Sequence, residues 1–394
     1  MNFAIRATLV DELLQTHQAY WRFNVYRGAH YQHLAKHAEL LRFLLALSDE
    51  QVQALQGDDS RLLNSIAPHF PAAASILSLI TLDSPPTVIP VHEPPPGVPG
   101  RKWQQISAFI KCHTTISRPA VEWCSGKGYL STAISQRFSL PAVGLEIDPQ
   151  LVAAGNCFAY KHHTEVKIID CDVLSDSVYQ HIEEEQHVLA LHACGGLHQR
   201  MLSLAVAQHC KQISLAPCCY HRFIDEYASL SAQLKLSPLH LTSDDLRTAV
   251  RQTNTARKGE TQARRTLQAW HLGFRELLRQ QGLASHTPLP SLPQHWSKTG
   301  FAAFCQRLVT LTQLTFALPS NLDAAENAGW SLLHRAERID LVRMAFRRAI
   351  EMRCVLDSVL FLEEQGYRCS LATFCRSELS PRNLLIQAQL PRSD

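Results

Sequence analysis

The stretch Val121-Glu-Trp-Cys-Ser-Gly-Lys-Gly-Tyr-Leu-Ser131, followed after a helical run by Val143-Gly-Leu-Glu-Ile-Asp148, decides the fold of this chain. An apolar strand ends in an acid, enters a turn with two glycines, opens a helix, and leads to a second strand that ends in another acid. Gly126 and Glu146 lie twenty residues apart. A Rossmann-type sheet uses this spacing to place an acid beside a nucleotide ribose. The pattern therefore predicts a nucleoside-cofactor site.

The glycine turn distinguishes between two cofactors. A dinucleotide site requires a third glycine three places after the second, and that place holds Ser131. The turn for S-adenosylmethionine (SAM) reads acid-x-Gly-x-Gly-x-Gly, and residues 122–128 read Glu-x-Cys-x-Gly-x-Gly. Cysteine replaces the first glycine, which is tolerated unless Cys124 needs a positive φ. We therefore expect SAM, with Glu122 near its methionine end and Glu146 accepting hydrogen bonds from the ribose hydroxyls.

A third acid is expected to contact the cofactor from the end of the third strand. Asp172 lies just past that strand, where side chains reach the crevice of an open α/β sheet. It could accept a hydrogen bond from the adenine amine, or it could simply cap the loop. The predicted cofactor residues all lie on the turns after the first three strands: Glu122, Cys124, Gly126, Gly128, Glu146 and Asp172.

Composition is that of an ordinary soluble enzyme. The 394 residues are 46% apolar and are sufficient for two or three lobes. No apolar run is long enough to span a bilayer, and the N-terminus lacks a signal-peptide core. Twelve cysteines without the spacing of a disulfide scaffold favour reduced thiols, and hence a cytoplasmic location. A net charge of +3 neither requires nor excludes a polyanionic partner.

The pattern of apolar residues divides the chain into five parts. Asp83–Gly100 contains seven prolines and two glycines, as an extended linker would. The expected parts are an N-terminal helical region (1–82), the proline-rich linker (83–100), a SAM-binding core (101–224), a helical insertion (225–340), and a C-terminal completion of the sheet (341–394). We expect a mostly parallel α/β sheet with helices on both faces.

Seven strands and two flanking helices account for this sheet. The expected strands are 120–124, 142–146, 166–169, 188–192, 213–217, 371–374 and 384–388. One helix is expected before the first strand, over 103–111, and a long one, over 341–365, before the sixth.

Chemistry in such a sheet takes place at the carboxyl ends of the central strands. The fourth strand ends Leu-His-Ala-Cys-Gly (191–195), and the fifth ends Pro-Cys-Cys-Tyr-His (217–221). If the methyl acceptor needs deprotonation, a histidine can serve as the base, although each could equally satisfy local backbone groups. The residues expected on the acceptor side are His192, Cys218, Cys219, Tyr220 and His221.

A metal site could also form here, from His192, Cys194, Cys218, Cys219 and His221. Zinc ligands are usually spaced by two to four residues, which the adjacent pair Cys218-Cys219 does not satisfy. Cysteine is also often a small buried residue. We therefore expect no metal.

The combination of Gly-Lys-Gly-Tyr-Leu-Ser (126–131), the two blocks above, and Leu-Ser-Pro-Arg-Asn (379–383) resembles the methyltransferase-like protein 25 group. The first three blocks are also similar to the eukaryotic tRNA ribose methyltransferases that act on acceptor-stem position 4. The resemblance covers about 101–221 and 341–394 and implies a class I SAM-dependent methyltransferase. Cys124 departs from the glycine usual in that turn, and the cysteine/histidine zinc modules of the tRNA enzymes are missing, so their substrate does not carry over.

Arginines and a lysine suggest RNA as the substrate. They gather in the expected insertion (Arg247, Arg251, Arg257, Lys258, Arg264, Arg265, Arg275 and Arg279), and a second group follows (Arg343, Arg347 and Arg348). A basic stripe of this kind can neutralise phosphates, although charge runs are usually solvated helix faces. The sequence thus predicts methyl transfer to an oxygen or nitrogen of RNA (tRNA or rRNA). The alternatives are a protein methyltransferase and a non-catalytic SAM-fold scaffold that binds RNA or a partner.

Overall fold

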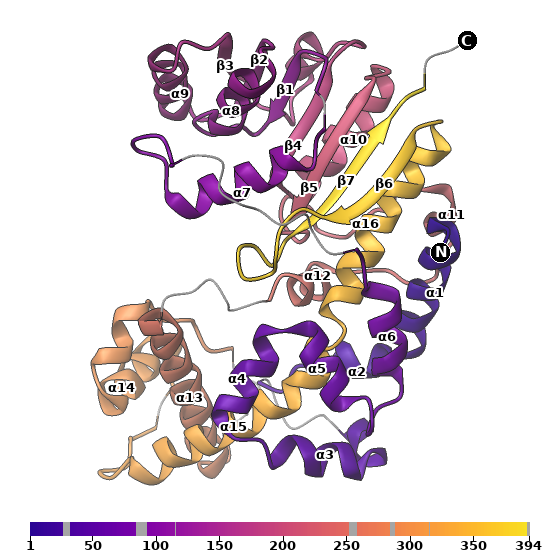
Figure 1. Ribbon diagram of the computed structural model, residues 1–394. Coiled ribbons are helices and arrows are strands. Elements are labelled where there is room, and N and C mark those ends of the chain that lie inside the picture. The colour runs from indigo at the N-terminus through magenta and orange to yellow at the C-terminus, as the bar shows by residue number, and fades with distance from the viewer. Residues whose placement is uncertain are drawn as a thin grey trace. The chain divides into compact units, whose positions relative to one another are not determined.

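The computed structural model describes residues 1–26, 32–83, 93–114, 116–251, 258–283, 288–314 and 316–391. The chain forms two compact units (Figure 1). Unit 1 comprises 1–16, 76–251 and 346–394, and unit 2 comprises 17–75 and 252–345. These units cut across the expected five parts. Half of the proline-rich linker, 84–92, lies outside the described residues.

Unit 1 is built on a seven-stranded sheet of order β3-β2-β1-β4-β5-β7-β6. The first five strands are parallel, whereas β7 is antiparallel to both β5 and β6. The bounds are β1 (Ala120–Trp123), β2 (Ala142–Glu146), β3 (Val166–Asp170), β4 (His187–Cys194), β5 (Gln212–Cys218), β6 (Arg368–Thr373) and β7 (Leu384–Gln389). The strand order reverses between β1 and β4, where a doubly wound sheet opens its ligand crevice. The expected Rossmann-like α/β fold is confirmed.

The helices that join these strands pack on the sheet through apolar faces. They are α7 (Gly100–Lys111), α8 (Tyr129–Phe138), α9 (Pro149–Lys161), η2 (Asp176–His181) and α10 (Gly196–Ala207). Ile106 and Phe109 of α7 and Ile134 of α8 are buried in one core with Leu189 of β4. The helix α9 begins where the Asp148 carboxylate accepts hydrogen bonds from the first-turn backbone, followed by a proline with a preset φ.

Further helices of unit 1 come from both ends of the chain. They are α1 (Phe3–Thr16), α11 (Ala232–Lys235), α12 (Ser243–Ala249) and α16 (Arg347–Glu364), while α6 (Ala72–Ile80) crosses the boundary between the units. The long helix expected around 341–365 is found as α16, but it begins six residues later, at Arg347, because α15 continues to Met344. The interruption falls where one compact unit ends and the other begins, and no proline or glycine in the sequence marks it.

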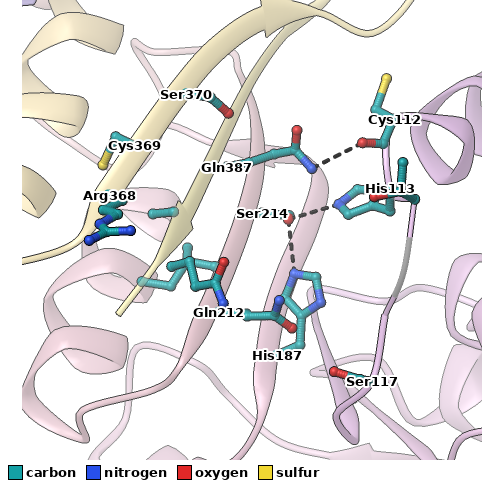
Figure 2. A pocket seen from close by; sticks show the side chains of 14 residues that line it. Cys112, His113, Ser117, His187, Gln212, Ser214, Arg368, Cys369, Ser370 and Gln387 are labelled. Carbon is teal, nitrogen blue, oxygen red and sulfur yellow. Dashed lines mark hydrogen bonds between the residues drawn. The ribbon is translucent and has the colours of Figure 1, made fainter. Parts of the chain in front are cut away.

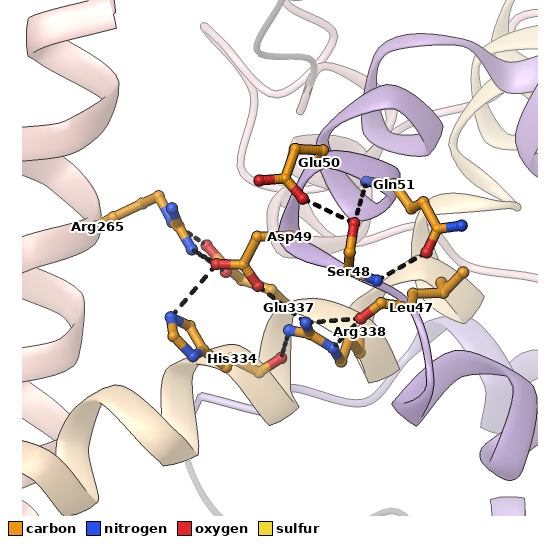
Figure 3. Close-up of polar contacts among 9 residues, drawn as sticks. All are labelled: Leu47, Ser48, Asp49, Glu50, Gln51, Arg265, His334, Glu337 and Arg338. Carbon is orange, nitrogen blue, oxygen red and sulfur yellow. Dashed lines mark hydrogen bonds and ion pairs between the residues drawn. The ribbon is translucent and has the colours of Figure 1, made fainter.

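Unit 2 is helical and joins segments that are distant in the sequence. It contains α2 (Gln18–Trp21), η1 (Gln32–Lys36), α3 (Ala38–Leu45), α4 (Asp49–Gly57), α5 (Asp59–Ile66), α13 (Lys258–Gln280), η3 (Gln294–Lys298), α14 (Phe301–Thr312) and α15 (Asp323–Met344). Phe274, Phe304 and Leu308 are fully buried in its core. Figure 3 shows the polar contact that ties α4 to α13 and α15, in which Asp49 pairs with Arg265 and Arg338.

No helix among the described residues is long and apolar enough to cross a membrane.

Candidate functional site

The turn between β1 and α8 is left-handed at three positions. Gly126 and Gly128 have φ of 60° and 62°, a region that glycine adopts without strain. A Cβ on Gly128 would lie 2.4 Å from Cδ1 of Ile168, so the turn also needs a small residue there. Cys124 has φ of 55°. Cysteine thus occupies a position where the backbone favours glycine, and its left-handed conformation costs about 1 kcal/mol.

Glu146 joins the first and second βα turns. Its carboxylate accepts a hydrogen bond from the Gly126 N–H at 2.8 Å and from the N–H groups of Ile147 and Asp148 at 3.1 Å each. An ionised carboxylate has about four acceptor sites. The carboxylate is half-buried and retains capacity for a further donor, such as a ribose hydroxyl.

Glu122 is bonded to the first turn of α8. It is buried, and its carboxylate accepts hydrogen bonds from the Ser131 N–H at 2.9 Å and the Ser131 hydroxyl at 2.6 Å. Burial raises the pKa of Glu122 to about 7, although both bonds from Ser131 act in the opposite direction. Both bonds fasten the first turn of α8 to β1, so Glu122 positions the glycine turn.

Asp172 is exposed, and its carboxylate accepts a hydrogen bond from the Leu174 N–H at 2.9 Å. This bond orders the loop, and the exposed carboxylate keeps acceptor sites for a further donor. The charges of all three acids act on one thiol, that of Cys124. Burial raises the pKa of the Cys124 thiol to about 12, and the charges of Glu146, Glu122 and Asp172 add to this effect. The predicted cofactor residues are thus close together at the carboxyl ends of β1, β2 and β3.

At the end of β4, His192 lies in a break in the strand register. The pairing of β4 with β5 shifts between Leu191 and Ala193, and the intervening His192 has φ of 69°. A bulge of this kind re-aims the side chains around it. Burial lowers the pKa of His192 to about 4, so the imidazole is neutral at pH 7. The charges of Lys102 and Arg382 act in the same direction.

Three cysteines meet where β4 and β5 end. Cys194 pairs in register with Cys218, and their sulfur atoms are 3.5 Å apart. Cys219 follows with φ of 43°, and the three sulfurs all lie within 4.8 Å of one another. Hydrogen bonds from Cys194 and Cys218 lower the pKa of Cys219, whereas hydrogen bonding among the three raises that of Cys218.

The structure separates the last two residues expected on the acceptor side. Tyr220 is 1% exposed, and its hydroxyl donates to Glu351 of α16 at 3.2 Å, so it holds the loop on the helix and does not face the crevice. His221 is half-buried. Burial lowers the pKa of His221, and the charge of Cys219 opposes this effect. Its Nδ1 is buried without a hydrogen bond to any described residue.

The basic residues expected to contact RNA are divided and largely paired. Arg247 and Arg251 belong to unit 1, and the described members that follow belong to unit 2; Arg257 and the side chain of Lys258 lie outside the described part. The expected second basic group is not a surface. Arg343 and Arg347 are 9% and 1% exposed, and Arg348 donates to Glu351 and Asn383. Sequence periodicity could not separate these buried arginines from exposed ones.

Three arginines of the first basic group form ion pairs with acids. Arg247 pairs with Asp244, Arg265 with Glu337, and Arg279 with Glu276. Asn383, the last residue of the block 379–383, is 7% exposed and donates to the Cys375 carbonyl at 2.7 Å, as a turn residue would.

Two kinds of residue at the crevice were not identified from the sequence. Ile147 follows Glu146 directly and is 60% exposed, an apolar surface beside the predicted ribose acid. The sequence did mark Ile147, as an apolar residue directly before the helix cap Asp148. Cations form the second kind. The positive charge of Lys102 lowers the pKa of Glu122 and of His192, and that of Arg222 lowers the pKa of Cys219. Their approach depends on tertiary packing.

A separate cavity of about 560 Å³ lies at the opposite edge of the sheet (Figure 2). His187 and Gln212, the first residues of β4 and β5, line it. The Ser214 hydroxyl lies 2.8 Å from Nε2 of both His113 and His187. Burial lowers the pKa of His187 to about 3. Because parallel strands have all their carboxyl ends on one edge, this cavity is distinct from the predicted cofactor site.

The sheet order and the glycine turn are those of a Rossmann-like fold. Residues 101–226 match the family model described as a methyltransferase domain. No curated protein matches the sequence.

Solved structures with similarity to this chain include three methyltransferases. A precorrin-6y C5,15-methyltransferase from Geobacter metallireducens is 13% identical, with a TM-score of 0.25, over 28% of this chain and 60% of its own. An RNA methyltransferase from Salinibacter ruber, in complex with S-adenosyl-L-homocysteine, is 14% identical, with a TM-score of 0.25, over 31% and 82%. A 23S rRNA methyltransferase is 12% identical, with a TM-score of 0.25, over 52% and 96%. This chain spans less than two thirds of the length of the first.

Proposed function

We propose that this protein is a SAM-dependent methyltransferase that acts on RNA, through an oxygen or nitrogen acceptor. The observation that carries the proposal is the convergence of Glu146, Asp172 and Cys124 at the carboxyl ends of three adjacent parallel strands, beside a left-handed glycine turn. The family match of residues 101–226 to a methyltransferase domain supports the same chemistry.

The residues of this edge fit SAM. Bound SAM would supply an electrophilic methyl group on a sulfonium sulfur. Glu146 would accept from the ribose hydroxyls and Asp172 from the adenine amine, and the exposed Ile147 would offer an apolar surface to the adenine ring. Glu122 holds α8 so that the backbone of the glycine turn approaches the cofactor closely.

Methyl transfer is an in-line displacement, so the protein chiefly aligns the acceptor and excludes water. His192 and His221 are at the carboxyl ends of β4 and β5, the neighbours of β1 on the other side of the switch point. Each is a hydrogen-bond acceptor for an incoming hydroxyl or amine while it is neutral.

The proposal of RNA depends on charge at this edge. The positive charges of four residues lower the pKa of the two histidines. Lys102 and Arg382 act on His192, and Arg247 and Arg222 act on His221. These residues come from four separate segments of unit 1. A cationic surround attracts a phosphate backbone and gives affinity that falls steeply with salt.

The test is a transfer assay with radiolabelled SAM, using the purified chain and lysate from cells that lack it. Label that RNase removes and protease does not would support the proposal. Label lost only to protease would identify a protein methyltransferase instead, and label no greater than with Glu146→Ala would favour the non-catalytic scaffold.

Glu146→Ala also tests the cofactor site directly. We expect SAM affinity to fall at least tenfold, because the ribose loses its carboxylate partner and the Gly126 turn loses its anchor. Isothermal titration calorimetry would measure the affinity, with Asp148→Asn as the control because it retains a side-chain oxygen for the α9 cap. Unchanged affinity in Glu146→Ala would contradict the site.

A further inference from the structure

The sulfur atoms of Cys194, Cys218 and Cys219 occupy a region the size of a metal coordination sphere. All three lie within 4.8 Å of one another, and those of Cys194 and Cys218 are 3.5 Å apart. In a tetrahedral zinc site with zinc–sulfur bonds of about 2.3 Å, neighbouring sulfurs are about 3.8 Å apart. The Cys194–Cys218 separation is close to this value, and the 4.8 Å limit on the other two admits it.

The backbone explains how two adjacent cysteines can both be ligands. Successive side chains of a strand point to opposite faces, so Cys218 and Cys219 would diverge if the strand simply continued. Cys219 instead adopts a left-handed conformation, with φ of 43°, which turns its sulfur to the same side as that of Cys218. On β4, the register shift at His192 lies two residues before Cys194. The usual spacing of zinc ligands argued against a metal because it does not allow for a left-handed residue between adjacent cysteines.

We propose that Cys194, Cys218 and Cys219 bind a thiophilic metal cation, in the first instance Zn²⁺, at the carboxyl ends of β4 and β5. Soft thiolate ligands select Zn²⁺ or Cu⁺ over Mg²⁺ and Ca²⁺. Three thiolates and one Zn²⁺ leave a surplus negative charge, and the positive charge of Arg222 acts on both Cys194 and Cys219 to offset it.

The fourth coordination position is open to water or an exogenous ligand. Among the described residues, no histidine nitrogen or carboxylate joins the three sulfurs within the 4.8 Å span. Three protein ligands with an open fourth position are typical of zinc sites that bind a small ligand. The metal would also link the end of β4 to that of β5. The proposal does not depend on methyl transfer.

The experiment measures metal in the full-length chain, produced in zinc-supplemented medium and purified without chelator. We expect about one zinc ion per chain by inductively coupled plasma mass spectrometry, and loss of that zinc in Cys218→Ser. The matched control is Cys157→Ser, which removes an exposed thiol of α9 and keeps the zinc. Glu146→Ala should also keep the zinc, so failure of the metal site and failure of the cofactor site are distinguishable.

A second measurement on the wild-type chain covers the case in which Cys218→Ser fails to fold. The chelator-treated chain is titrated with Co²⁺ under reducing conditions. We expect thiolate-to-cobalt absorption and the visible bands of tetrahedral cobalt, saturating at one equivalent and displaced by Zn²⁺. The absence of these bands, or a zinc content equal to that of Cys218→Ser, would overturn the proposal. So would a Cys194–Cys218 disulfide found by mass spectrometry of freshly purified protein.

Discussion

Three of the non-glycine residues with a left-handed backbone lie near the carboxyl ends of strands. Cys124 and Cys219 follow β1 and β5, and His192 lies two residues before the end of β4. Such conformations persist only where the surroundings impose them, and they occur often at functional sites. At Cys124 the residue type itself opposes the backbone, so the strain can be tested by substitution.

Cys124→Gly should leave the stability of the protein unchanged or raise it by up to about 1 kcal/mol, because glycine removes the strain while adding freedom to the unfolded chain. Cys124→Val should lower the free energy of unfolding by about 2 kcal/mol, since a β-branched residue is poorly accommodated at φ of 55°. Chemical denaturation measures both. Cys157→Gly, in the right-handed helix α9, is the control and should destabilise by about 1 kcal/mol.

The buried His187 makes stability depend on pH. Its folded-state pKa of about 3 lies below the ordinary value of 6.5, through burial first and then the charges of His113 and Arg118. The unfolded chain therefore binds the proton more readily, and the stability present above pH 6.5 is lost as the pH falls toward 3.

We expect this residue to account for about 2 kcal/mol of the stability lost between pH 7.5 and pH 5.0. His187→Gln keeps a polar partner for Ser214 without titrating, so its loss over the same interval should be smaller by that amount. Urea denaturation at the two pH values measures the difference. Equal losses in the two proteins would show that His187 is protonated in the folded state.

At the scale of elements, the polar contact of Figure 3 holds α4 to α13 and α15. The Asp49 carboxylate accepts from Arg338 at 2.8 Å and from Arg265 at 3.3 Å, and Glu337 also pairs with Arg265. Burial alone would raise the pKa of Asp49, but hydrogen bonds from Arg338 and Arg265 lower it. Ser48 caps the same end of α4, so the helix begins at the contact.

Asp49→Ala should lower the free energy of unfolding of unit 2 by about 2 kcal/mol, because two mostly buried guanidinium groups lose a partner. Hydrogen exchange of peptides from α4, α13 and α15 would show the loss of protection. Glu39→Ala, an exposed acid in the first turn of α3, should change it by less than about 0.5 kcal/mol. Similar protection in both variants would mean that apolar packing alone holds α4.

At the scale of the molecule, α1 near the start of the chain and β7 near its end both belong to unit 1. In α1, Asp11 accepts a hydrogen bond from Arg353 of α16 at 2.6 Å. The side chains of Asp11 and Arg353 are 7% and 1% exposed, and Arg353 also donates to the Leu239 carbonyl. The ion pair therefore connects three segments of unit 1.

Asp11→Ala should destabilise unit 1 by about 3 kcal/mol or more, because it leaves the buried Arg353 without its carboxylate. The neighbouring exposed Glu12→Ala should have little effect. Hydrogen exchange of α16 peptides in the full-length chain distinguishes the two. Unchanged exchange in Asp11→Ala would show that Arg353 finds another acceptor.

Local sequence was sufficient for much of the fold. Apolar runs with turn residues at their ends predicted the seven strands to within a few residues, and β2 at its observed bounds, because strand formation follows side-chain alternation and burial over a few positions. The glycine turn and the acids at 122, 146 and 172 identified the edge of the sheet where the cofactor residues meet, since parallel strands place their carboxyl ends together.

Only tertiary structure decided what depends on partners distant in the chain. It turned Tyr220 toward Glu351, buried Arg343 and Arg347, and grouped residues 17–75 with 252–345. It also brought Cys194 to Cys218 and Cys219 across β4 and β5. The physical reason is the same in each case. Periodicity reports which face of an element is apolar, whereas ion pairs, buried charges and sulfur clusters form between elements that folding brings together.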